Sequence, residues 1–108
     1  MTPAELDAFI SKKMSKSHIY QPAILTVLLE NDGKASVRSI AERCNKVTGK
    51  PTSEFEKSLQ KYPKQALITN GVIKVEQSQF QLTCSDISDE LRARLVRATT
   101  EAMSKFST

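Results

Sequence analysis

Few side chains in this chain could act as catalysts or metal ligands, and their spacing does not bring them together. The sequence holds one histidine, His18, and two cysteines, Cys44 and Cys84, which stand 40 positions apart. A zinc site needs about four such ligands, and acid–base or nucleophilic catalysis needs a nucleophile, a base and an orienting group in one place. The glycines do not form a glycine-rich phosphate-binding loop. The sequence therefore predicts a protein that is not an enzyme, with no catalytic residue, metal, cofactor or small-molecule substrate.

The cysteines and the apolar runs bear on the location of the protein. Small buried thiols are typical of intracellular proteins, so we expect both cysteines to be reduced core residues; a disulfide between them is the alternative. The longest apolar run, Ala23–Leu29, is much shorter than the roughly 20 residues that span a bilayer. Glu5 and Asp7 occupy positions where a signal peptide is basic. The sequence predicts a cytoplasmic protein that does not contact a membrane.

Basic side chains gather in the middle of the chain, where their chemistry is that of phosphate binding. Residues 31–84 carry nine Lys or Arg against five Asp or Glu, which accounts for the whole net charge of +4. Six of these cations fall within residues 43–64: Arg43, Lys46, Lys50, Lys57, Lys61 and Lys64. A basic surface attracts nucleic acid because each neutralised phosphate releases condensed counterions. A lysine-rich face that serves solubility is the alternative interpretation.

Polar side chains that could read base edges follow this basic segment. Gln65 carries an amide that can pair with adenine in the major groove, and Thr69 carries a hydroxyl. Their alternative interpretation is solvated helix surface. Tyr62 could contact DNA, or it could set the turn before Pro63. The candidate DNA-binding residues are Lys46, Lys50, Lys57, Lys61, Tyr62, Lys64, Gln65, Thr69 and Lys74.

Apolar periodicity and capping signals predict the helices that must position these side chains. A capping box at Thr2 starts the first helix, Ser36 caps the third, and Ser88 caps a long last helix. The predicted helices cover residues 3–15, 22–30, 37–48, 53–70 and 89–106, with Pro63 kinking or restarting the fourth. The last helix carries an apolar stripe of Leu91, Leu95, Ala98 or Thr99, Ala102 and Phe106. We expect this stripe to pack against the first helix and the core; a dimer contact is the alternative.

Two short alternating runs after the fourth helix predict a β-hairpin. Ile73 and Val75 point one way on the first run, Phe80 and Leu82 are the apolar residues of the second, and Gln77-Ser78 forms the polar tip. A short strand at Ala35 is expected to pair with this hairpin. The order of elements is that of a winged helix. We therefore predict a mostly helical α+β fold, in which residues 1–108 form one winged helix-turn-helix domain with a short hairpin wing and additional N- and C-terminal helices.

Three stretches of sequence add a family resemblance. They are HIYQPAILTVLLENDGKASVRSIAERC (18–44), YPKQALITNGVIKVEQSQFQLT (62–83) and DELRARLVRATTEAMSKF (89–106). Together they resemble a winged-helix module of prokaryotic restriction-type proteins, in the YQP opening, the KAS turn and the NG stop before the hairpin. In that family the module is often joined to an HNH nuclease or another catalytic domain. The resemblance implies a role in a restriction or defence system, and some members are thought to read N6-methyladenine in DNA.

The functional expectation combines these signals. In a helix-turn-helix the second helix of the pair enters the major groove, which here is the helix predicted from Ser53 to Asn70. We expect non-catalytic binding of double-stranded DNA, with the chain acting as the specificity module of a restriction protein and reading methyladenine. A protein-interaction module and a small transcriptional regulator are the alternatives. The expected partners are DNA and either a second copy of the chain or a nuclease domain.

Overall fold

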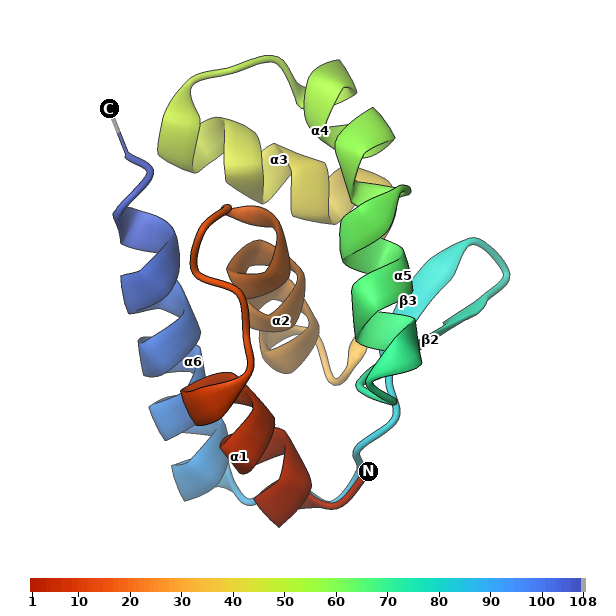
Figure 1. Ribbon diagram of the computed structural model, residues 1–108, viewed down its shortest axis with the longest axis vertical. Coiled ribbons are helices and arrows are strands. Elements are labelled where there is room, and N and C mark those ends of the chain that lie inside the picture. The colour runs from red at the N-terminus through yellow and green to blue at the C-terminus, as the bar shows by residue number, and fades with distance from the viewer. Residues whose placement is uncertain (108) are drawn as a thin grey trace.

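The computed structural model describes residues 1–107 and is an α+β fold in which helices pack around a common core and a small sheet lies at one edge (Figure 1). Its elements are α1 (Pro3–Lys12), α2 (Tyr20–Glu30), β1 (Lys34–Ser36), α3 (Val37–Thr48), α4 (Thr52–Leu59), α5 (Tyr62–Thr69), β2 (Ile73–Glu76), β3 (Gln79–Leu82) and α6 (Asp89–Ser104). The segment from α2 to β3 has the winged-helix order, and α1 and α6 are the additional terminal helices. The fold class predicted from the sequence is confirmed.

Local signals explain where the helices begin. The Thr2 hydroxyl accepts a hydrogen bond from the Glu5 amide, and the Glu5 carboxylate accepts one from the Thr2 amide, so the predicted capping box is present. The Ser36 and Ser88 hydroxyls cap α3 and α6 in the same way. Gly49 ends α3 in the left-handed conformation, with φ of 76°.

The fourth predicted helix, Ser53 to Asn70, is divided before Pro63. The chain forms α4 and α5 instead, with a non-helical Lys61 (ψ −126°) between them. Pro63 gives the physical reason, because a proline inside a continuous helix lacks the amide donor and its ring clashes with the preceding turn. Pro63 instead lies in the first turn of α5, where that amide has no helical partner to lose. Of the two predicted alternatives, the structure contains the restart.

The sheet has three antiparallel strands in the order β1-β3-β2. Phe80 on the central strand β3 faces Ala35 of β1 on one side and Val75 of β2 on the other. Gln77 and Ser78 form the predicted two-residue tip, both with positive φ. The expectation that Ala35 forms a short strand with the hairpin is confirmed.

One continuous core lies beneath this sheet and between the helices, with α2 at its centre (Figure 1). Every residue of α2 from Pro22 to Leu29 is buried. Ile40 of α3, Leu67 of α5 and Phe80 of β3 are fully buried, so the hairpin shares one core with these helices. Val75 departs from the inward pattern of Ile73, since it is 40% exposed near the hairpin tip, beyond the cover of the helices.

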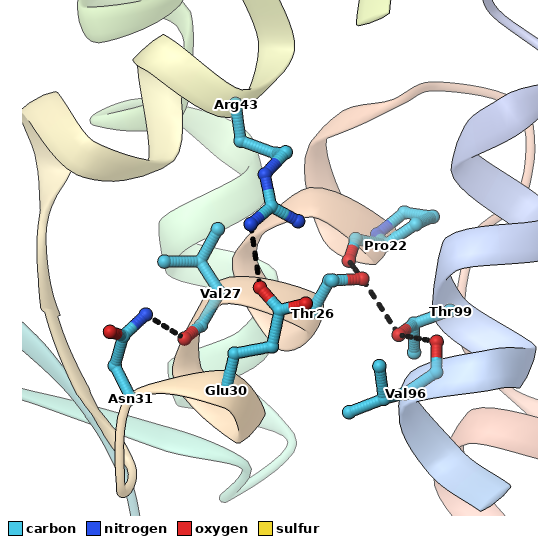
Figure 2. Close-up of polar contacts among 8 residues, drawn as sticks. All are labelled: Pro22, Thr26, Val27, Glu30, Asn31, Arg43, Val96 and Thr99. Carbon is cyan, nitrogen blue, oxygen red and sulfur yellow. Dashed lines mark hydrogen bonds and ion pairs between the residues drawn. The ribbon is translucent and has the colours of Figure 1, made fainter. Parts of the chain in front are cut away.

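The apolar stripe of α6 packs inside the molecule, as preferred from the sequence. Leu95, Thr99 and Ala102 are buried where α6 lies along α2, whereas Ala98 is exposed. Two threonines join these helices: the Thr26 hydroxyl donates to that of Thr99 at 2.7 Å, and Thr99 donates to a carbonyl of its own helix (Figure 2). The central residues of the stripe are therefore covered by α2 of the same chain and not left open for a dimer contact. Within residues 1–107, no helix is both long and apolar enough to cross a membrane.

Candidate nucleic-acid interface

A groove runs between the start of α3, the helix α4 and the hairpin tip. Strand pairing creates it, because Ser36 lies opposite Gln79 and so brings the first turn of α3 to the end of the hairpin. The groove has a volume of about 660 Å³ and is lined by Ser36, Val37, Arg38, Glu56, Lys57, Gln60, Lys61 and Ser78. We call this surface the basic groove.

Three cations and one anion line the basic groove. Arg38 comes from α3, Lys57 from α4 and Lys61 from the α4–α5 junction, and Glu56 is the acidic group among them. The local formal charge is thus +3 − 1 = +2. None of the three cations makes an ion pair with another of the described residues. Their charges are therefore available to an anionic ligand such as a phosphate backbone.

Two cations that the sequence analysis named, Arg43 and Lys74, already form ion pairs within the protein. Arg43 binds Glu30 of α2 at 2.6 Å, as Figure 2 shows, and so joins α3 to α2. Lys74 on β2 lies 3.3 Å from Glu76 of the same strand. A phosphate would have to compete with these carboxylates, so both cations are weaker phosphate ligands than those of the basic groove.

The remaining predicted lysines fall in two places. Lys64 lies one helical turn beyond Gln60, whose side-chain oxygen accepts a hydrogen bond from the Lys64 ammonium at 3.2 Å, so it stands beside the groove. Lys46 and Lys50 do not line it. Lys46 is ten residues beyond Ser36 in a helix that rises about 1.5 Å per residue, which places it about 15 Å from the hairpin. Lys50 follows in the loop between α3 and α4 and is not among the residues of the groove.

The start of α5 borders the basic groove, because Lys61, the residue immediately before this helix, lines the groove. Pro63 and Leu67 are buried against the core, which leaves Gln65 and Thr69 on the opposite, exposed side. The Gln65 amide donates to the Thr69 hydroxyl at 3.3 Å across one turn. Gln65 and Thr69, which were selected as base readers, therefore lie together, and their mutual hydrogen bond would have to break before either could bind another group.

Tyr62 stands at the first position of α5 with 77% of its surface exposed. The alternative, that Tyr62 sets the turn before Pro63 by packing against the core, is not supported, since its ring is mostly open to solvent. A large exposed aromatic next to cations is typical of surfaces that stack on nucleic-acid bases. Tyr20, in contrast, is half-buried at the start of α2 and packs its ring edge-on against Phe55 of α4 at 6.4 Å.

Arg38 was not among the residues selected from the sequence. Residues 34–39 carry two cations and no acidic group, but Arg38 lies outside the basic segment from Arg43 to Lys64 on which the selection from the sequence was based. The signal that could have found it is the cap at Ser36, because that residue fixes Arg38 in the first turn of α3. Combined with the expected pairing of Ala35 with the hairpin, this would have placed Arg38 beside the wing.

The groups that could support chemistry are not assembled into a site. In the part of the chain that the structure describes, no cluster of three His, Cys, Asp or Glu side chains could hold a metal ion. Cys44 and Cys84 are buried free thiols. Burial raises the pKa of Cys44 to about 12 and also raises the pKa of Cys84. Both remain protonated near neutral pH, which is typical of core residues and not of nucleophiles.

Comparison of the chain with models of known protein families, with curated proteins and with solved structures gave no match.

Proposed function

We propose that this chain is a non-catalytic module that binds double-stranded DNA. The observation that supports it best is the convergence of Arg38, Lys57 and Lys61 on the basic groove, directly beside the exposed face of α5. These residues come from three different elements, and none is held by a carboxylate in an ion pair among residues 1–107. Unpaired cations from separate elements around one groove are what a phosphate backbone requires.

In this proposal α5 enters the major groove and the basic groove binds the adjacent backbone. An α-helix such as α5 is about 10–12 Å in diameter with its side chains, which fits the width of about 12 Å of the major groove of B-DNA. Gln65 and Thr69 then face base edges. Arg38, Lys57, Lys61 and Lys64 contact phosphates, while Lys74, Lys46 and Lys50 are available to more distant ones.

Two narrower proposals rest on the sequence resemblance. One is that the protein is the specificity module of a cytoplasmic restriction or defence system and acts with a nuclease domain or a second copy of the chain. The other is that it reads N6-methyladenine. Tyr62 supports the second, because it is the most exposed large apolar side chain on this face and a methyl group needs an apolar contact. A test of methyl reading is competition between matched methylated and unmethylated duplexes, where equal affinity would contradict it.

A protein-interaction module is the alternative from another class. The stripe of α6 from Leu91 to Phe106 was its candidate contact surface, but the central residues of this stripe are buried against α2. The remaining exposed apolar side chains, Ile68 and Val75, lie near the proposed DNA face. A small transcriptional regulator would use the same DNA-binding surface, so it differs in biological role and not in the interface.

The dependence of DNA binding on salt tests the proposal. With four phosphate contacts, the slope of log K against log salt concentration should be about −3 to −4 for a short duplex, measured by fluorescence anisotropy. Lys57→Ala and Lys61→Ala should each flatten that slope by about one unit. Lys105→Ala is the matched control, because it removes the same charge at the end of α6. Binding that does not depend on salt, or an equal effect of the control, would contradict the proposal.

A further inference from the structure

A second cavity lies on the other side of α5, between that helix and the segment that joins α1 to α2. Its volume is about 290 Å³, near the lower limit of roughly 300 Å³ for ligand pockets. The α5 wall consists of Tyr62, Pro63, Ala66 and Asn70, and the opposite wall includes Lys13, His18, Tyr20 and Gln21. We call it the aromatic pocket.

The aromatic pocket and the basic groove are lined by residues that follow one another in the chain. Lys61 lines the basic groove and the next residue, Tyr62, lines the aromatic pocket. Lys13 adds a cation to the rim of the pocket. A DNA strand that follows the start of α5 would therefore pass from the basic groove to the mouth of this pocket.

Rings on both walls suit a flat aromatic group. Tyr62 stands on the α5 wall with its ring largely exposed. On the other wall, Tyr20 is held by its edge contact with Phe55, and the His18 ring lies 5.9 Å from it at an angle of 46°. These rings are positioned by packing of the protein itself, so a planar ligand would find the opposite wall already formed.

Two amide side chains give the pocket both a donor and an acceptor. The Gln21 side-chain oxygen accepts a hydrogen bond from the Ser15 amide at 2.9 Å, which leaves its NH₂ group to donate. The Asn70 NH₂ group donates to the Ala66 carbonyl at 2.8 Å, which leaves its oxygen to accept. The edges of nucleobases carry both acceptors and N–H donors, so they can satisfy both groups.

We infer that the aromatic pocket binds one unpaired base of a DNA strand whose backbone lies along the basic groove. The inference rests on the proposed function. It goes beyond that function by stating that the protein prefers DNA with an extrahelical base to fully paired DNA. In a paired duplex, a base must first be unstacked and unpaired before it can enter such a pocket, whereas a bulged base avoids most of that cost.

The test compares two duplexes of equal length that differ by one bulged adenine. We expect the unmutated protein to bind the bulged duplex at least fivefold more tightly in anisotropy titrations at fixed salt. Stacking on an aromatic side chain changes the affinity for a base roughly 5- to 150-fold, so Tyr62→Ala should remove the preference. Tyr62→Phe should retain it because the ring remains. Tyr62 is exposed, so neither variant should unfold the protein.

A neighbouring variant separates the two proposals. Lys61→Ala should weaken binding to both duplexes by the same factor, because it contacts phosphate and not the base. Equal affinity of the unmutated protein for the two duplexes, or equal losses for both with Tyr62→Ala, would overturn the pocket inference and leave DNA binding intact. Failure to bind either duplex at low salt would overturn both.

Discussion

Removal of the Phe80 ring tests whether the hairpin is a packed part of the fold. Phe80 is fully buried at the centre of the sheet, opposite Ala35 and Val75, in the core that also contains Leu67. Truncation of a buried phenylalanine to alanine costs about 3–5 kcal/mol, because transfer free energy is lost and a cavity remains. A small domain has only about 5–15 kcal/mol of stability, so Phe80→Ala should remove a large part of it.

Urea denaturation, monitored by circular dichroism, measures this loss in the free energy of unfolding. With a slope near 2 kcal/mol per molar, a loss of about 4 kcal/mol lowers the midpoint by about 2 M. Val75→Ala is the matched control, since Val75 is the cross-strand neighbour of Phe80 but 40% exposed, and it should cost less than about 1 kcal/mol. A Phe80→Ala loss below about 1 kcal/mol, or equal losses for the two variants, would refute the packed hairpin.

Three further predictions concern other parts of the molecule. Thr99→Val should cost no more than about 1 kcal/mol, because the Thr26 hydroxyl can turn to the Pro22 carbonyl at 2.8 Å; a loss above about 2 kcal/mol in urea melts would contradict this. Ser78→Gly should raise the melting temperature, because Ser78 has a φ of 65° that glycine adopts without strain, and a lower melting temperature would argue against this turn geometry. Since the folded-state pKa of the Cys44 thiol is raised to about 12, its contribution to stability is complete below the unfolded pKa of roughly 9 and is lost as the pH rises toward 12. Cys44→Ala should therefore reduce the fall in stability over that pH range, and an unchanged pH profile would contradict the assignment.

Local features of the sequence were sufficient to predict most of the fold. Caps such as Thr2, Ser36 and Ser88 act within one helical turn, so the sequence around them contains the whole signal. The hairpin was predictable for the same reason, since its alternating residues and its tip are neighbours in sequence. Pro63 was recognised as a disruption, but a proline near a helix start and one at a kink look alike in sequence.

The candidate site was harder to predict because it depends on contacts between distant segments. Charge density along the chain grouped Lys46 and Lys50 with Lys57, although α3 carries the first two away from the hairpin. Arg38 lies at the groove because β1 pairs with β3, whose residues come 43–47 positions later in the chain. The carboxylate that holds Arg43 comes from α2 and could not be inferred from spacing.

The most direct test of the central claim is a map of amide chemical-shift changes in the ¹⁵N-labelled protein on titration with a short DNA duplex. The proposal predicts that the largest changes occur at Arg38, Lys57, Lys61 and Gln65, around the basic groove and along α5. The outer face of α6, at Ala93 and Arg97, should remain unchanged. Changes centred on α6, or no saturable change at low salt, would contradict DNA binding through this surface.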